Sequence, residues 1–343
     1  MLKTIIIITT ISISLHLVSC TNATQKNNKD TIISQSTTQL THKKITKITI
    51  PFDTIQYQML VKKLANGDTT GKWPVKSAPV PTLGAILPFK RIIAYYGNLY
   101  SKNMGILGAY KPKEMWTKLN AEVTKWNKAD GSTKAIPALH YIAVVAQGSA
   151  GKDGKYRFRM PESQIDSVLN IANMGKALVF LDIQVALSNI EQELPRLEKY
   201  LKLPHVHLGI DPEFSMKTGK KPGSVIGTFD AKDINYASNY LAELVRKNNL
   251  PAKILIIHRF TKNMLTNYKQ IKLYPEVQTV INMDGWGAPQ LKINTYRSYI
   301  YQQPVQFTGF KLFYKNDLKK NGKMMSPEQI LKLTPKPIYI QYQ

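Results

Sequence analysis

Short apolar runs alternate with longer amphipathic segments along the chain after Lys90. Eight runs have the β-branched and aromatic character of buried strands, at 91–97, 136–146, 177–185, 206–214, 253–260, 277–286, 310–314 and 338–342. Seven segments with helical periodicity separate them, near 113–128, 162–174, 189–201, 231–248, 262–270, 290–302 and 326–332. Strands joined by crossover helices form parallel sheets. We therefore predict an α/β fold, a (β/α)8 TIM-like barrel that lacks its last helix and closes by pairing 338–342 with 91–97.

A doubly wound open sheet is the alternative fold. The chain has no Gly-x-Gly-x-x-Gly turn after the first predicted strand and no Gly-x-x-x-x-Gly-Lys-Ser/Thr loop, which disfavours the nucleotide-binding versions of that fold. The chain has one cysteine, which excludes an intrachain disulfide framework and any cysteine-based zinc or iron–sulfur site.

The first twenty residues resemble the precursor of a bacterial lipoprotein. Lys3 precedes an apolar stretch at 4–18, and Ser19 and Cys20 follow it. The resemblance implies that 1–19 is a lipoprotein signal peptide and that Cys20 carries lipid after cleavage. We therefore expect the protein in the bacterial cell envelope, attached to a membrane through lipid on Cys20.

Two further segments precede the predicted barrel. Residues 20–50 are rich in Thr, Asn, Gln, Ser and Lys, and this composition predicts a disordered tether. Residues 51–90 contain five prolines and few periodic runs, so we predict an irregular N-terminal arm that packs on a barrel domain at 91–343.

The chain is strongly basic, with 47 Lys and Arg against 22 Asp and Glu and a formal net charge of +25. This charge favours an anionic partner, such as an acidic polysaccharide or an anionic lipid surface. No nucleic-acid-binding motif accompanies the charge, so we expect no nucleic-acid partner.

Acidic side chains gather at the ends of predicted strands. Asp182 ends the third strand, Asp211 and Glu213 end the fourth, and Asp284 ends the sixth. TIM barrels carry their chemistry at the carboxyl ends of the strands, and a buried carboxylate without a partner is costly. We therefore predict that these four carboxylates meet at one catalytic site, although an Asp at such a position also commonly caps the next helix.

The Asp211-Pro212-Glu213 segment resembles the Asp-x-Glu of chitinase-type glycoside hydrolase barrels. The resemblance implies that Glu213 protonates the leaving oxygen, while Asp211 orients it and helps to set its pKa. Asp182 or Asp284 then acts as nucleophile or base. The sequence departs from the fuller Asp-x-x-Asp-x-Asp-x-Glu pattern, which puts substrate-assisted chemistry in doubt.

Six more residues near strand ends are predicted to bind substrate. Aromatic rings stack on sugar rings, and polar or basic groups orient the substrate. The six are Tyr96, Gln184, His258, Arg259, Trp286 and Lys311.

We expect no metal and no cofactor, because only His258 among the six histidines falls at the carboxyl end of a predicted strand. The sequence also leaves two alternatives to the hydrolase. One is a non-catalytic glycan-binding or envelope-scaffold lipoprotein. The other is a phosphodiesterase whose Mg²⁺ or Ca²⁺ is held by the four carboxylates, with His258 and Arg259 acting on phosphate.

Several longer phrases are similar to a family of secreted bacterial proteins without an established activity. The similarity runs from about 87 to 343 and includes Asp284-Gly285-Trp286-Gly287 and the stretch at 309–314. It implies a shared fold and carries no activity over to this chain.

Overall fold

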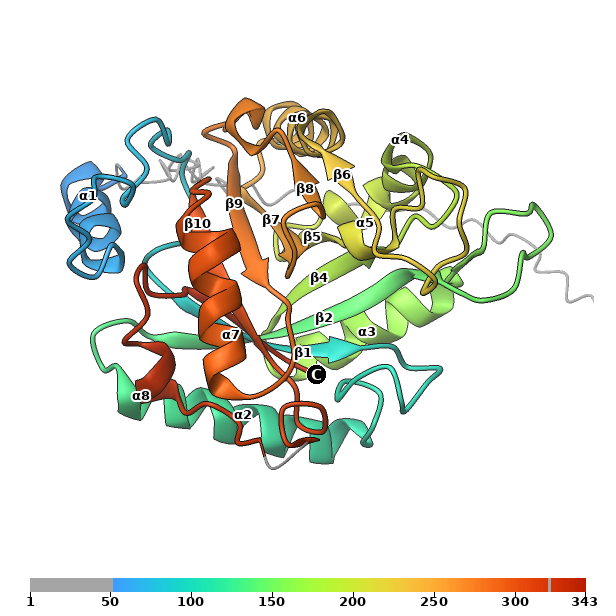
Figure 1. Ribbon diagram of the computed structural model, residues 1–343, viewed down its shortest axis with the longest axis horizontal. Coiled ribbons are helices and arrows are strands. Elements are labelled where there is room, and N and C mark those ends of the chain that lie inside the picture. The colour runs from blue at the N-terminus through green and yellow to red at the C-terminus, as the bar shows by residue number, and fades with distance from the viewer. Residues whose placement is uncertain (1–51, 320–321) are drawn as a thin grey trace, which may run out of the picture. The chain divides into compact units, whose positions relative to one another are not determined.

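Eight parallel strands close into a barrel in the computed structural model, which describes residues 52–319 and 322–343 (Figure 1). The last strand pairs with the first, from Ile92 beside Tyr339 to Tyr95 beside Tyr342, so the predicted (β/α)8 TIM-like barrel and its closure are confirmed. The chain runs through the barrel in the order β1 (Arg91–Gly97), β2 (Ala135–Ala146), β4 (Leu178–Ile183), β5 (Val206–Ile210), β7 (Lys253–Arg259), β9 (Val277–Met283), β10 (Phe307–Leu312) and β11 (Tyr339–Tyr342).

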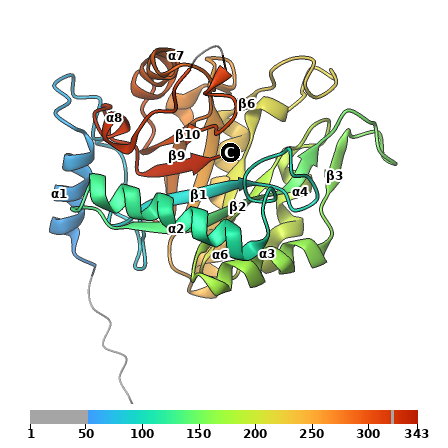
Figure 2. The same cartoon turned by 90° about the horizontal axis from the view of Figure 1, so that it is seen from below.

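Helices cover the outside of the barrel (Figure 2). Two of them, α2 and α3, lie side by side, and the indole of Trp116 donates to the carbonyl of Ile171 between them at 3.1 Å. The helices after β1 are α2 (Pro112–Ala129), α3 (Glu162–Met174), α4 (Ile190–Glu193), α5 (Glu198–Leu201), α6 (Ala231–Asn248), α7 (Pro289–Thr295) with a π-helical extension at Tyr296–Tyr301, and α8 (Pro327–Ile330).

The helix predicted at 262–270 is wrong. This segment contains the two-residue strand β8 (Leu265–Thr266), which pairs with β6 (Phe229–Asp230), and one 3₁₀ turn at Tyr268–Gln270. The guanidinium group of Arg259 accounts for part of this shape, because it donates hydrogen bonds to the carbonyl oxygens of Thr261 and Lys262 at 3.2 and 3.0 Å. Those two carbonyls accept from a side chain and not from a helical backbone N–H.

Several barrel strands end earlier than the sequence predicts. The strand β5 ends at Ile210 because Pro212, which has no backbone N–H, begins a 3₁₀ turn at Pro212–Phe214 with Asp211 as its cap. The strand β9 likewise ends at Met283, one residue before Asp284. Asp211 and Asp284 therefore lie at the first positions beyond their strands.

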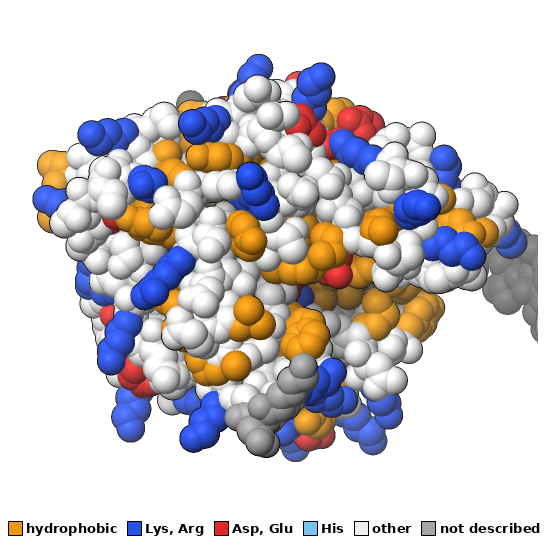
Figure 3. Space-filling view, in the orientation of Figure 1, with side chains coloured by type: hydrophobic (Ala, Val, Ile, Leu, Met, Phe, Trp, Pro, Cys, Tyr) orange, Lys and Arg blue, Asp and Glu red, His pale blue; other side chains and the backbone are white. Residues whose placement is uncertain are grey.

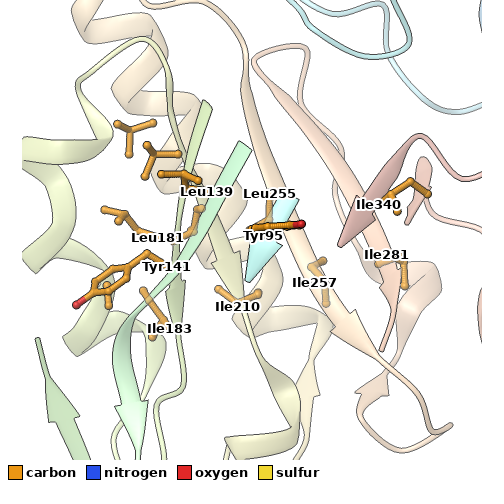
Figure 4. Packing of buried hydrophobic residues seen from close by; sticks show 14 of the residues in the cluster. Tyr95, Leu139, Tyr141, Leu181, Ile183, Ile210, Leu255, Ile257, Ile281 and Ile340 are labelled. Carbon is orange, nitrogen blue, oxygen red and sulfur yellow. The ribbon is translucent and has the colours of Figure 1, made fainter. Parts of the chain in front are cut away.

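Two apolar layers pack the barrel. Outward-facing strand residues such as Leu181, Ile257 and Ile340 pack against the helices (Figure 4). A second cluster fills the lower interior, the part of the barrel at the amino ends of the strands, where Phe180 and Ile256 are completely buried. The interior at the amino ends of the strands is mostly apolar, apart from buried polar side chains such as His207 and Gln278.

The segment at 52–90 closes the amino end of the barrel and belongs to the same compact unit. It contains one regular element that the sequence did not predict, the helix α1 (Thr54–Leu64), which Asp53 caps by accepting from Gln56 N–H at 2.8 Å. Tyr57 of this helix is buried with Leu87 against the lower interior. The Gln278 side chain at the start of β9 accepts from Leu87 N–H at 3.0 Å, which ties the segment to the barrel.

The predicted signal peptide at 1–19, the lipidated Cys20 and the tether at 20–50 lie outside the described residues. Among the residues that are described, none of the helices is both long and apolar enough to cross a bilayer.

Candidate active site

The carboxyl ends of the strands surround a pocket of about 440 Å³. Apolar side chains border a hollow near the middle of this face, and an acidic side chain is visible at its edge (Figure 3). Seven of the predicted site residues line the pocket, namely Tyr96, Gln184, Asp211, Glu213, Asp284, Trp286 and Lys311. Apolar residues also line it, among them Met104, Ile142, Phe260 and Phe313.

Asp284 is an ionised carboxylate at the floor of the pocket. One carboxylate oxygen lies 2.9 Å from the Lys311 ammonium, and the other lies 2.8 Å from His258 Nδ1. Burial opposes ionisation, but these two cations hold the pKa of Asp284 below its usual value. Asp284 therefore keeps its negative charge at neutral pH.

Glu213 has the opposite electrostatic environment. Its carboxyl group lines the pocket and has no hydrogen-bond or ion-pair partner among the residues at 52–319 and 322–343. Burial, together with the nearby charges of Asp211 and Asp284, raises the pKa of Glu213 from 4.5 to about 8. Glu213 is therefore protonated at neutral pH, when Asp284 is ionised.

Asp211 links Glu213 to the pocket wall. Its carboxylate accepts from the Glu213 backbone N–H at 3.1 Å and from the Gln184 amide at 3.2 Å. Burial is the main cause that raises the pKa of Asp211 to about 7, and the charges of Asp182 and Asp284 add to it. Asp211 and Glu213 therefore titrate as a pair.

Asp182 lies below the floor and has no exposed surface. Tyr96 donates its hydroxyl proton to Asp182 at 2.9 Å and separates that carboxylate from the pocket. His258 and His140 hold the pKa of Asp182 well below its usual value in spite of burial. Tyr96 and not Asp182 therefore lines the pocket, which does not fit the nucleophile role predicted for Asp182.

His258 is also completely buried beneath the pocket. Burial would lower its pKa, but the carboxylates of Asp182 and Asp284 raise the pKa of His258 to about 10. It orients Asp284 from below and does not line the pocket, in contrast to its predicted contact with substrate.

Arg259 points away from the pocket, since it follows His258 on the strand and side chains alternate. Its guanidinium group is buried and hydrogen-bonded to the Tyr299 carbonyl at 3.1 Å and to the Gln303 amide oxygen at 2.6 Å. The substrate-binding role predicted for Arg259 is therefore wrong. The phosphate contact that the phosphodiesterase alternative required is lost with it.

The two aromatic residues predicted to stack on sugars differ in what they offer. The Lys311 ammonium lies 3.9 Å from the ring centre of Tyr96, so a cation already occupies that face. Trp286 is 51% exposed at the pocket rim, and the Lys319 ammonium lies 5.4 Å from its ring centre. Trp286 is therefore the available aromatic platform.

Sequence reasoning did not place His140 in the site. It lies in the middle of β2, but its ring reaches the interior, where Nε2 lies 3.4 Å from Asp182. Burial lowers the pKa of His140 to about 4, so it is neutral. The strand pairing that places His140 beside Phe180, two residues before Asp182, is a tertiary feature that no local pattern reports.

A second hollow of about 710 Å³ adjoins the first, with which it shares Phe313 and Gln343. It lies between α2 and the loops that follow β1 and β10. Four lysines line it, and its one acidic residue, Glu122, is paired with Lys125 at 3.0 Å. The four are Lys102, Lys118, Lys125 and Lys315. This hollow is basic and has no free carboxyl group for acid/base chemistry.

No family model matches this chain, and no curated protein matches it. A crystal structure of a GH18 chitinase from Pseudoalteromonas aurantia is similar to it, with 11% sequence identity over 74% of this chain and 94% of that chain and a TM-score of 0.33.

Proposed function

We propose that this protein is a glycoside hydrolase that acts on a polysaccharide by carboxylate acid/base catalysis. One observation carries the proposal: the pocket contains a carboxyl group with a raised pKa, Glu213, and one with a lowered pKa, Asp284. Glycosidic bond cleavage needs a protonated and an ionised carboxyl group at the same pH. Environments that push the pKa values of two carboxyl groups apart supply both.

Glu213 is the general acid in this proposal and protonates the leaving oxygen. Asp211 orients it, because it holds the Glu213 backbone N–H and adds its charge to the causes that raise the pKa of Glu213. Asp284 is the nucleophile or base, held in place by Lys311 and His258. Asp182 is a positioning residue that acts through Tyr96.

The basic second hollow supports an acidic glycan as substrate. A glycan chain in the pocket reaches the lysine-lined hollow past Phe313, which lines both. Lysine ammonium groups bind carboxylates or sulfates on such a chain, and Trp286 supplies a stacking face in the pocket.

The test compares glycosides with two kinds of leaving group. A dinitrophenolate leaves without protonation, whereas a simple alcohol needs a general acid. Glu213→Gln is expected to lose at least about 100-fold in kcat/KM on polysaccharide and on alkyl glycosides, and to keep most of its activity on dinitrophenyl glycosides. Wild-type kcat/KM is expected to fall above about pH 8, where Glu213 loses its proton.

The control is Glu191→Gln, at an exposed residue of α4, which removes one carboxylate far from the pocket. Equal loss on both leaving groups in Glu213→Gln, or full activity on both, would remove Glu213 as the acid. Glycan binding without turnover in the wild type would favour the non-catalytic glycan-binding protein.

We also propose that lipid on Cys20 anchors the protein to a membrane of the bacterial cell envelope. The support is the order of Lys3, apolar stretch, Ser19 and Cys20. Labelled fatty acid fed to expressing cells is expected to be incorporated into the wild type and not into Cys20→Ser. Equal labelling of the two would refute the anchor.

A further inference from the structure

Three buried polar atoms converge below the pocket floor. They are Nε2 of His140, Oδ1 of Asp182 and Nε2 of His258, and all three side chains are fully buried. The Asp182 oxygen lies 3.4 Å from His140 Nε2 and 3.6 Å from His258 Nε2. None of the three atoms has a hydrogen-bond partner among the described residues. Buried polar atoms are nearly always satisfied, so three together require an explanation.

The other polar atom of each group also faces a polar neighbour. His258 Nδ1 lies 2.8 Å from Asp284, and His140 Nδ1 lies 2.6 Å from the Tyr339 hydroxyl. The second oxygen of Asp182 accepts from Tyr96 at 2.9 Å. Metal-binding histidines show this arrangement, in which one ring nitrogen contacts an orienting group and the other faces the ion.

The spacing of the three atoms fits a metal ion better than a water molecule. Ligands about 2.0–2.2 Å from a tetrahedral ion lie about 3.3–3.6 Å from one another. Partners of a tetrahedral water, each about 2.8 Å away, lie about 4.6 Å apart. The two measured separations, 3.4 and 3.6 Å, agree with the first geometry.

Gly209 keeps space beside the cluster. A Cβ atom at this position would lie 2.4 Å from His140 Nε2 and 2.5 Å from Asp182 Oδ1. Any other residue would therefore push these two atoms out of their positions. The backbone of β5 approaches the cluster closely only because residue 209 has no side chain.

We propose that His140, Asp182 and His258 bind one divalent transition-metal ion of the zinc class. Two imidazole nitrogens and one carboxylate oxygen suit zinc, whereas magnesium and calcium prefer oxygen ligands alone. The ion fixes Tyr96 through Asp182 and Asp284 through His258, so it stiffens the floor of the pocket. This inference rests on the cluster and does not depend on the proposed hydrolase activity.

The sequence argues against such a site, because His140 and His258 lie 118 positions apart and only His258 falls at a strand end. The closed barrel brings them together, with ring centres 5.5 Å apart. Without metal, a protonated His258 pairs with both carboxylates, and a metal ion that binds Nε2 displaces its proton to solvent. The two arrangements differ in whether the chain binds zinc.

The experiment titrates zinc and cobalt into the purified full chain after treatment with a chelator. The chain carries Cys20→Ser, which removes its one thiol as a competing ligand. We expect one ion per chain by calorimetry, and the intense visible absorption of tetrahedral cobalt. Asp182→Asn and His140→Gln are each expected to weaken binding at least about 100-fold.

The matched control is His207→Gln, which removes another fully buried histidine, one that lies on β5 outside the cluster, and is expected to bind zinc as the parent does. No stoichiometric binding by the parent, or equal binding by all variants, would overturn the proposal. If the variants fail to fold, anomalous diffraction from zinc-soaked crystals of the parent decides. A peak between the three atoms supports the site, and a peak elsewhere or none refutes it.

Discussion

The protonated state of Glu213 predicts an unusual dependence of stability on pH. Its pKa rises from 4.5 to about 8 on folding, so between these values the folded chain holds a proton that the unfolded chain has lost. Stability falls with rising pH wherever the folded state binds more protons. The contribution of Glu213 to the free energy of unfolding is therefore fully present below about pH 4.5 and is lost as the pH rises to about 8.

The size of the effect follows from the same pKa values. At about 1.4 kcal/mol per pH unit, a rise from 4.5 to about 8 corresponds to about 5 kcal/mol. Asp211 titrates with Glu213, and the Glu213 side chain is only partly buried, and both reduce this value. We therefore expect the free energy of unfolding to fall by about 2–4 kcal/mol between about pH 5 and pH 8 through Glu213.

The assay is urea unfolding followed by tryptophan fluorescence at several pH values for the wild type and Glu213→Gln. Gln cannot ionise, so the variant is expected to gain stability relative to the wild type as the pH rises. Only the difference in slope matters, so a constant cost of the substitution does not affect the result. Parallel curves for the two proteins would show that Glu213 ionises as readily when folded as when unfolded, and the general-acid assignment would fail. Glu191→Gln controls for the loss of one charge.

Three further predictions concern the pocket and its floor. Lys311→Met and Asp284→Asn are each expected to lower the free energy of unfolding by about 3–5 kcal/mol, because each leaves the other charge buried without its partner at 2.9 Å. The double variant is expected to lose less free energy of unfolding than the sum of the two single variants. Trp286→Ala is expected to raise KM for polysaccharide about tenfold with little change in unfolding, because the ring is 51% exposed. Gly209→Ala is expected to destabilise by about 1–3 kcal/mol and to abolish zinc binding, because its Cβ would lie 2.4 Å from His140 Nε2.

Each of these predictions has an outcome that contradicts it. Additive effects in the double variant would mean that Lys311 and Asp284 are not coupled. An unchanged KM in Trp286→Ala would remove the sugar platform. Wild-type stability and wild-type zinc binding in Gly209→Ala would show that the interior around residue 209 is looser than the distances indicate.

The sequence predicted the barrel because a two-sided buried strand and an amphipathic helix each leave a local pattern. The strand predicted at 91–97 has its predicted bounds, and the predicted closure against the last strand is present. The segment at 262–270 was mispredicted because its shape depends on Arg259 and on pairing with Phe229–Asp230, and neither partner lies within it.

The candidate site was predictable to the extent that chemistry gathers at strand ends. Asp211, Glu213 and Asp284 carried that signal, since Asp211 and Asp284 directly follow apolar runs and Glu213 lies two residues after Asp211. Which carboxylate is protonated was not predictable, because the pKa of Glu213 depends on burial and on neighbours from other strands. Local sequence contains no such distances.

The sequence by itself determined the order of strands and helices and the acidic character of one end of the barrel, because both follow from residue types at short spacing. Only the tertiary structure decided that His258 faces the interior and Arg259 the outside, and that His140 meets Asp182. Closing the barrel fixes the register of neighbouring strands, and register decides which side chains share a layer. Contacts between strands far apart in the chain therefore appear only when the barrel is closed.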